Sequence, residues 1–544
     1  MSSTLHSLKD LTDSSRCVGK RVGKSAVPSP QMVSPGIMAA MERSILNDVT
    51  DESKKLHKLG YYHGLRPRAD CEALLKNVGD FLLRSRVMID HTTKRRTFEL
   101  IISVYSGVRR EHLSLYYDKK TMHWDLNIYR RKRHKHSIVE GRASRFLHLS
   151  DMIAYYQANP ILNSVKLTNP IRRPDWIITA GCLKYDDQKD ELGRGNFAVV
   201  IKGYIERRDK PPLQVAVKKL PEERIDDERT ERENACNALF KEAHLMNKFH
   251  HPNVITFYGV CCDLPPVMVV TELCAGGSLE SHLVKTGDAI SNGERLLFIT
   301  EAARGMNYLQ RKNCIHRDLA SRNCLIAANG VVKISDFGLS KMVEATAKIT
   351  DDTVPKNLPL RWMAPETINR QPKFSSKSDV WGFCVMIYEV FNNGIKPWNS
   401  DDDYRKIGHA IRNGKMPEPP KRTPAEMLDL MKSCWQMDPE KRPNFCDILK
   451  EVREMSKKNP KLAYPVAKEC TTSKIPGVIR IEPKEEELEK SLMEQPPINT
   501  LSSDDLKRSS SVTNTNTTTT TTTTTSEDLE HKCTPKNKNK RSRH

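Results

Sequence analysis

Apolar residues occur in short patterned segments between about residue 60 and residue 455, and these segments predict individual helices and strands. Near the start of this region, residues 68–76 predict a short helix. An apolar strand follows it and runs through Phe-Leu-Leu to Arg84. The pattern therefore predicts a strand that carries a basic side chain toward the interior.

Three patterned segments lie close together further along the chain. Residues 192–200 predict two strands joined by a tight glycine turn, and a β-branched strand follows that ends in Lys218. Apolar residues with helical spacing at 240–246 predict a helix that carries Glu242. The lysine and the glutamate are expected to pair across this part of the fold.

The two ends of the chain have a different composition. The first segment mixes serine, proline, glycine and basic residues, and the last contains a threonine run at 517–525 and a basic end. Such segments bury too little apolar surface to offset the entropy of the chain. We expect five segments: a disordered segment at 1–55, a domain at 60–170, a linker at 171–185, a larger domain at 186–455 and a disordered tail at 456–544.

One stretch of the larger domain carries a recognisable chemistry. Residues 314–324 read Cys-Ile-His-Arg-Asp-Leu-Ala-Ser-Arg-Asn-Cys, and Asp-Phe-Gly follows from Asp336. Phosphoryl transfer from ATP needs a carboxylate to accept a hydroxyl proton, and an amide and a second carboxylate to hold Mg²⁺. Asp318 fits the first role, and Asn323 with Asp336 fits the second.

The predicted glycine turn fits the phosphate-binding part of the same site. Backbone N–H groups of such a turn lie over the phosphates, and Lys218, positioned by Glu242, is expected to hold them. The third glycine of the usual pattern is Ala198, whose methyl group is expected to lower ATP affinity modestly. The residues expected around the nucleotide here are Leu192, Gly193, Arg194, Gly195, Asn196, Phe197, Ala198, Val199, Val200 and Ala216.

These elements, in this order, make residues 186–455 resemble the protein kinase family, which implies a bilobal fold with ATP and Mg²⁺, or Mn²⁺ in its place. Arg322 and the run Pro-Leu-Arg-Trp-Met-Ala-Pro-Glu at 359–366 resemble the tyrosine kinases, which implies a tyrosine acceptor steadied by Arg322. The resemblance also places Thr271 beside the adenine pocket, with the backbone of Glu272 and Cys274 at the hinge.

Two further residues of this domain resemble structural positions of kinases. Asp379 is expected to brace the catalytic loop, and Arg442 is expected to pair with Glu366. Both should matter more to folding than to chemistry.

The smaller domain resembles an SH2 domain, a central antiparallel sheet flanked by two helices, so the whole chain is of the α+β class. The resemblance rests on Tyr-Tyr-His-Gly at 61–64 and on the strand that contains Arg84. It implies that Arg84 anchors phosphotyrosine through its planar donor fork, with Arg68 and His112 beside it. Arg86 replaces a usual serine and either points to solvent or adds a third phosphate donor.

The order of the two domains resembles the Fes/Fer group of nonreceptor tyrosine kinases, without the long membrane-bending helical domain of that group. The resemblance implies transfer of the ATP γ-phosphate to tyrosines of protein substrates. The small domain is then expected to target or regulate the kinase through phosphotyrosine proteins. An SH2 adaptor with an inactive kinase scaffold is the alternative, but Lys218, Asp318 and Asp336 are all present.

The segment before the substrate platform lacks a tyrosine between Asp336 and Glu366, although Arg317 is retained. Asp351 and Asp352 could supply fixed carboxylates to Arg317, and the neighbouring Thr350 and Thr353 could be phosphorylated instead. We expect activity without tyrosine autophosphorylation here, with control by docking of the small domain on the small lobe or by a partner.

Charge and cysteine usage limit the remaining possibilities. The formal net charge is +20, and residues 130–136 form a basic cluster that no aromatic stacking platform accompanies, so a solvated loop is favoured over a DNA-binding face. This pattern favours an acidic phospholipid surface or an acidic phosphoprotein over specific nucleic-acid binding. The scattered cysteines, without C-x-x-C pairs, predict reduced thiols. The lack of an apolar run of about 20 residues and Ser2 in place of glycine argue against a membrane span and a myristoyl anchor. They also predict a cytoplasmic protein, at most peripheral at the plasma membrane.

Overall fold

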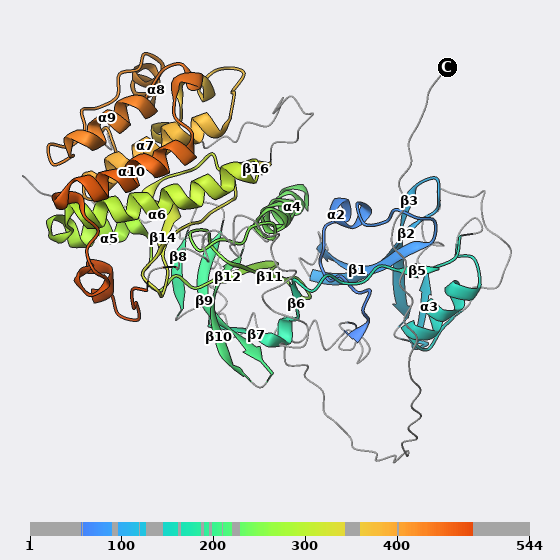
Figure 1. Ribbon diagram of the computed structural model, residues 1–544. Coiled ribbons are helices and arrows are strands. Elements are labelled where there is room, and N and C mark those ends of the chain that lie inside the picture. Colours follow the sequence, from blue (N-terminus) through green and yellow to red (C-terminus); the bar gives the residue numbers. More distant parts are fainter. Residues whose placement is uncertain are drawn as a thin grey trace, which may run out of the picture.

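The computed structural model describes residue 56 and residues 58–89, 96–118, 120–126, 145–161, 165–186, 190–194, 198–208, 210–219, 229–342, 359–399, 402–481 and 483. Several expectations concern residues outside this part of the chain, namely Gly195, Asn196 and Phe197, the basic cluster 130–136, residues 350–353, and the tails at 1–55 and 484–544. The described residues form an N-terminal module, drawn in blue and teal in Figure 1, and a two-lobed unit drawn from green to red.

The N-terminal module is a sheet with a helix on each side (Figure 1). Its strands run in the order β4-β3-β2-β1-β5, and all neighbours are antiparallel except the parallel pair β1 and β5. The elements are α2 (Arg68–Glu72), β1 (Asp80–Ile89), β2 (Arg96–Tyr105), β3 (Arg110–Asp118), β4 (His123–Leu126), α3 (Leu149–Ala158) and β5 (Asn169–Pro170). The helix expected at 68–76 is shorter than predicted, because a turn follows Glu72.

The alternation of side chains along β1 explains how this module buries a charge. Phe81 and Leu83 join the core that contains Trp124, while Leu82 points to the other face. Successive side chains of a strand point to opposite faces, so Arg84 shares the face of Leu82, on the side of α2. Arg84 is only 5% exposed.

The small lobe of the second unit is built on a seven-stranded sheet. Its order is β6-β11-β12-β10-β9-β7, and β8 also pairs with β9. The elements are β6 (Ile177–Ile178), β7 (Leu183–Tyr185), β8 (Glu191–Arg194), β9 (Val199–Arg207), β10 (Lys210–Lys219), α4 (Arg229–Met246), β11 (Phe257–Cys261) and β12 (Met268–Glu272). In β10, Val215 and Val217 are fully buried in the sheet core, so Ala216 and Lys218 lie on the opposite face.

The large lobe is mostly helical. Helix α6 lies at its centre and is buried over most of its length. The elements are α5 (Leu279–Thr286), α6 (Asn292–Arg311), β13 (Cys314–Ile315), β14 (Cys324–Ile326), β15 (Val332–Ile334), β16 (Lys341–Met342), α7 (Ser376–Phe391), α8 (Tyr404–Arg412), α9 (Ala425–Cys434) and α10 (Phe445–Lys458). Strands β14 and β15 form an antiparallel hairpin. Strands β13 and β16, which flank this hairpin in the sequence, form a second two-stranded antiparallel sheet.

The expected disordered tail at 456–544 is wrong for its first part. Helix α10 continues to Lys458, and three short 3₁₀ turns follow: η9 (Pro460–Leu462), η10 (Ala467–Glu469) and η11 (Thr471–Lys474). Leu462, Cys470 and Val478 are buried. Their partners belong to distant helices, which local composition cannot reveal.

Among the cysteines that the structure describes, no disulfide is formed. Within the part of the chain that the structure describes, no helix is both long and apolar enough to cross a membrane.

Candidate active site

Lys218 forms the centre of a charge cluster between the two lobes. Its ammonium lies 2.7 Å from Oε1 of Glu242 on α4 and 3.2 Å from Oδ1 of Asp336. Burial disfavours the charged lysine, but the two carboxylates outweigh it and raise the pKa of Lys218. The cation is therefore fixed in place and fully ionised at neutral pH.

Asp336 is the more accessible of the two carboxylates, with 48% of its side chain exposed against 7% for Glu242. Burial acts to raise its pKa, but Lys218 prevails and holds the pKa of Asp336 below its ordinary value. Asp336 is thus an ionised and partly open carboxylate, as a hard cation requires of a ligand.

The catalytic loop connects β13 to β14 and brings three of the expected residues together. Arg322 forms an ion pair with Asp318, and the side-chain amide of Asn323 donates to the backbone oxygen of Asp318 at 2.7 Å. Burial raises the pKa of Asp318 to about 6, an effect to which the charge of Asp336 adds and which Arg322 opposes. A carboxylate with this pKa is suited to accept a proton near neutral pH.

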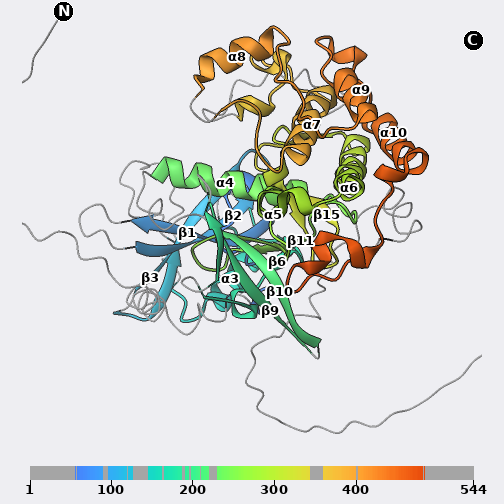
Figure 2. The same ribbon diagram turned by 90° about the vertical axis from the view of Figure 1, so that its left-hand side faces the viewer.

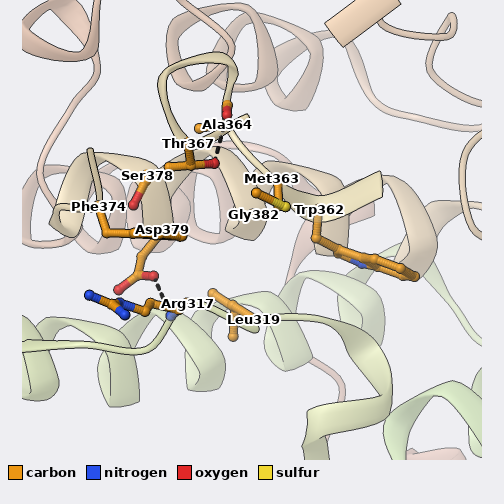
Figure 3. A pocket seen from close by; sticks show the side chains of 10 residues that line it. All are labelled: Arg317, Leu319, Trp362, Met363, Ala364, Thr367, Phe374, Ser378, Asp379 and Gly382. Carbon is orange, nitrogen blue, oxygen red and sulfur yellow. Dashed lines mark hydrogen bonds between the residues drawn. The ribbon is translucent and has the colours of Figure 1, made fainter. Parts of the chain in front are cut away.

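The loop is braced by Asp379 of α7, as expected. Its two carboxylate oxygens accept hydrogen bonds from the backbone N–H groups of His316 and Arg317 at 2.8 and 2.9 Å. Figure 3 shows the bond to Arg317. Arg317 adopts a positive φ of 69°, which these hydrogen bonds help to hold. A small pocket beside this brace is lined by Arg317, Phe374 and Trp362 among others (Figure 3).

Sequence reasoning missed Ser335, which joins the two halves of the site. Both its backbone N–H and its hydroxyl donate to the backbone oxygen of Asn323 at 2.9 Å. The residue before Asp336 is thereby tied to Asn323, the last residue of the catalytic loop. Its position directly before Asp-Phe-Gly was the only signal in the sequence.

The run that resembles a substrate platform lies against the catalytic loop. The guanidinium of Arg322 is 4.1 Å from the ring centre of Trp362. Glu366, at the end of this run, accepts two hydrogen bonds of 2.7 and 2.9 Å from Arg442, which confirms the predicted pair. Arg442 is fully buried, so this pair fixes the platform to the helical lobe.

Several residues expected around the nucleotide lie on the strands of the small lobe. Ala216 on β10 lies opposite Thr271 on β12, and Thr271 is half-buried. Cys274 lies just beyond β12 and is half-buried too. The side chain of Glu272 is committed elsewhere, because it pairs with Lys333 at 2.8 Å. Only its backbone is left for a nucleotide.

The glycine-turn residues described by the structure differ in exposure. Leu192 is 52% exposed, and Gly193 and Arg194 are exposed as well, on β8. Ala198 is buried and Val199 lies in the sheet core, at the start of β9 with Val200. The exposed and buried residues form the two strands that the pattern predicted.

A cluster of basic side chains lies in the N-terminal module. Arg84 donates to the hydroxyl of Ser103 at 3.3 Å, and the same hydroxyl is 2.9 Å from Nδ1 of His112. Arg68 and His112 both contact Oε1 of Glu72, at 2.7 and 2.8 Å. The structure therefore brings the three predicted basic residues together and adds a carboxylate that sequence reasoning missed.

Arg86 neither points freely to solvent nor faces an open pocket. It forms an ion pair with Glu99, its direct neighbour across β1 and β2, and both side chains are about one-fifth exposed. Neither reading of this residue anticipated that pair.

The N-terminal module docks on the small lobe, as predicted, beside α4 (Figure 1). Asp70 lies 2.7 Å from Nε2 of His244, which is two residues beyond Glu242. Arg173 of the linker pairs with Asp263 at 2.6 Å, and Trp176 packs against the ring of His244 at 5.1 Å. The regulatory role expected of this docking stays a prediction.

Comparisons with known proteins agree with the geometry of the two-lobed unit. Residues 187–452 match the family described as protein tyrosine and serine/threonine kinase. Over 427 residues the chain is 33% identical to Fer-related kinase 1 of Caenorhabditis elegans, which covers 77% of this chain and 98% of that protein.

Longer relatives match over a similar region. The tyrosine-protein kinase Fer of Rattus norvegicus is 32% identical over 421 residues, which is 76% of this chain and 46% of Fer. The transforming protein Fps of avian sarcoma virus (strain PRCII) is 30% identical over 417 residues, 76% of this chain and 70% of that protein. The chain thus spans about half the length of the Fer proteins that it matches. With its kinase domain and this similarity to Fer-related kinase 1, the chain belongs to the Fer-like family of protein tyrosine kinases.

Proposed function

We propose that the chain transfers the γ-phosphate of ATP to tyrosine hydroxyl groups of protein substrates. The observation that carries this proposal is the intact set Lys218, Glu242, Asp318, Asn323 and Asp336, gathered between the two lobes. An inactive scaffold does not require the arrangement seen here, in which Lys218 is ion-paired to Glu242 and to the half-exposed Asp336.

In this mechanism Asp318 orients the tyrosine hydroxyl and accepts its proton, and Arg322 steadies the phenol oxygen from the platform side. Lys218, held by Glu242, contacts the α- and β-phosphates. Asn323 and the half-exposed Asp336 fit a hard divalent cation and would hold Mg²⁺, which neutralises phosphate charge when bound.

A purified-protein assay tests this function. With Mg-ATP and a tyrosine-containing polymer, the wild type should transfer phosphate, and Asp318→Asn should lower kcat by about 10²- to 10⁴-fold because it removes the proton acceptor. A polymer with serine and threonine but no tyrosine serves as the control for the acceptor. Equal phosphate transfer by the wild type and by Asp318→Asn would refute the proposal.

We propose further that the N-terminal module is an SH2 domain that binds phosphotyrosine and thereby directs the kinase to phosphorylated proteins. The support is the buried Arg84, whose neighbours Ser103 and His112 form a polar pocket with Arg68 at its rim. A buried guanidinium beside neutral partners gains most from a dianionic ligand with two oxygens to offer.

Phosphotyrosine peptide binding to the full chain tests this second proposal. Arg84→Ala should weaken binding by about 2 to 5 kcal/mol, because it removes a buried charge-assisted contact. Arg109→Ala is a matched control, since that arginine is 75% exposed and pairs with Glu111. Arg84→Lys keeps the charge and should restore only part of the binding. Equal affinity of wild type and Arg84→Ala would exclude this pocket.

A further inference from the structure

The segment that follows α10 packs against the large lobe and ends at the turn between β14 and β15. Figures 1 and 2 show this chain, in dark orange, passing α5 and α6 toward β14 and β15. We call residues 459–481 the C-terminal strap. Kinase chemistry as proposed above gives it no role.

Polar contacts fix the strap along its length. The hydroxyl of Thr471 donates to the carboxylate of Glu294 at 3.0 Å and accepts from Nε2 of His282 at 2.9 Å. The hydroxyl of Tyr464 lies 2.8 Å from that of Thr300 on α6. These partners are buried or partly buried, so the strap is part of the folded lobe.

Arg480 makes the deepest contact of the strap. Its guanidinium forms an ion pair with Glu301 of α6, and the two side chains are 0% and 1% exposed. The same guanidinium donates to the backbone oxygen of Gly330 at 2.6 Å. The other carboxylate oxygen of Glu301 accepts the backbone N–H of Val332 at 2.8 Å. The pair therefore holds the turn and the start of β15 together.

The backbone of the strap holds the same turn. The N–H groups of Ile479 and Ile481 donate to the carbonyl oxygens of Ala328 and Asn329 at 2.8 and 2.9 Å. Gly330 has a φ of 72° and lies so close that a Cβ atom there would be 3.0 Å from Arg480. The turn between β14 and β15 is therefore in close contact with the strap.

This turn closes the hairpin that carries both expected metal-binding residues. Strand β14 begins directly after Asn323, and β15 ends two residues before Asp336. Cys324 pairs with Ile334, so the two functional residues leave the hairpin at the same open end. A shift of the closed end would change how Asn323 and Asp336 face each other, since a three-residue ladder is short.

We infer that Arg480 is a positioning residue for Asn323 and Asp336, acting through Glu301 and the β14–β15 hairpin. This inference rests on the proposed phosphoryl transfer for its consequence but not for its test. The strap thus belongs to the catalytic unit, outside residues 187–452 that match the kinase family.

The test compares nucleotide binding with and without metal, measured with a fluorescent ATP analogue on the full chain. In the wild type Mg²⁺ should strengthen binding. Arg480→Gln should reduce this metal-dependent gain by about 10-fold, the usual size of a loss of support behind metal ligands, while metal-free binding changes less than about 2-fold. The kcat for phosphate transfer should fall, with KM for the protein substrate unchanged.

Three further variants separate positioning from general stability. Arg480→Lys keeps the buried charge and should fold and recover most of the metal-dependent gain. Glu301→Gln should reproduce the loss, and Lys468→Gln, an exposed lysine of the same strap, should behave as wild type. If Arg480→Gln fails to fold, Arg480→Lys and Glu301→Gln supply the comparison.

The outcomes are distinct. An unchanged metal-dependent gain in Arg480→Gln and Glu301→Gln would overturn the inference. An equal loss of nucleotide affinity with and without metal, together with a lower Tm, would mean that the strap only stabilises the fold. That result would also overturn the inference. Absence of phosphate transfer in the wild type would refute the proposed function, yet the binding comparison would still decide the role of Arg480.

Discussion

Lys218 and Arg84 are both cations placed to meet a phosphate, but their surroundings differ in kind. Lys218 lies between two carboxylates, at 2.7 and 3.2 Å. Arg84 donates to a neutral hydroxyl, that of Ser103. The difference matches the two expected ligands, because nucleotide phosphates arrive with a divalent cation whereas phosphotyrosine arrives without one.

The carboxylates Asp336 and Glu72 are therefore expected to have different roles at the two sites. Asp336 belongs to the kinase site, since a metal ion needs an anionic ligand there. Glu72 bonds to both Arg68 and His112, so under the proposed function a phosphate would compete with it. In these proposals the kinase site keeps its carboxylate when the ligand binds, and the N-terminal module would release Glu72 from its partners.

The largest expected effect concerns Lys218. Lys218→Met should lower kcat/KM for phosphate transfer by at least about 100-fold, because no fixed cation then faces the phosphates. Phosphotyrosine peptide binding should be unchanged, which a parallel titration can check. Lys184→Met, at an exposed lysine of the same sheet, is the control. A loss of both functions would show that the two sites are not independent.

The pH dependence of transfer should be the next largest effect. Asp318 must be ionised to accept a proton, and burial raises its pKa to about 6. The kcat should therefore be constant above about pH 7 and fall about tenfold per pH unit below pH 6. Arg322→Gln removes the cation beside Asp318 and should move the midpoint to higher pH. A flat profile down to pH 5 would argue against Asp318 as the base.

The smallest effect should come from substitution of Glu72, measured on phosphotyrosine peptide binding. It tests the contrast between the Lys218 and Arg84 sites most directly. Glu72→Gln removes the carboxylate that competes for Arg68 and His112, so phosphotyrosine peptides should bind about 2- to 5-fold more tightly, as expected for partly exposed ion pairs. Fluorescence anisotropy measures the change. Glu111→Gln removes an equal charge, one paired with Arg109, and should leave affinity nearly unchanged. Weaker binding by Glu72→Gln would mean that Glu72 supports the pocket.

Local sequence was enough to predict the kinase residues because their spacing reflects fixed chemistry. Asp318 and Asn323 lie in one short loop, and Lys218 lies near the end of a strand whose alternation puts it on the face opposite Val217. The pairs Lys218–Glu242 and Arg442–Glu366 were also anticipated, since the family pattern relates residues far apart in the chain.

Pairs without such a pattern were missed. Nothing in the sequence near Arg86 points to Glu99, which meets it only through the register of β1 and β2. Likewise Glu72 reaches His112 across 40 positions of sequence, after α2 has packed beside the sheet.

The strap shows the same limit at a larger scale. Its sequence is polar enough to read as a disordered tail, and that reading follows correctly from composition when each segment is judged alone. What orders it is the tertiary structure, in which Glu301 of α6 is buried and needs a cation, and Arg480 is the side chain that reaches it. The sequence by itself determined which residues are the candidates for the chemistry, because catalysis demands particular groups at short spacing. Only the tertiary structure decided which distant charges meet outside the family pattern, because a buried charge is stabilised by whatever the fold brings beside it.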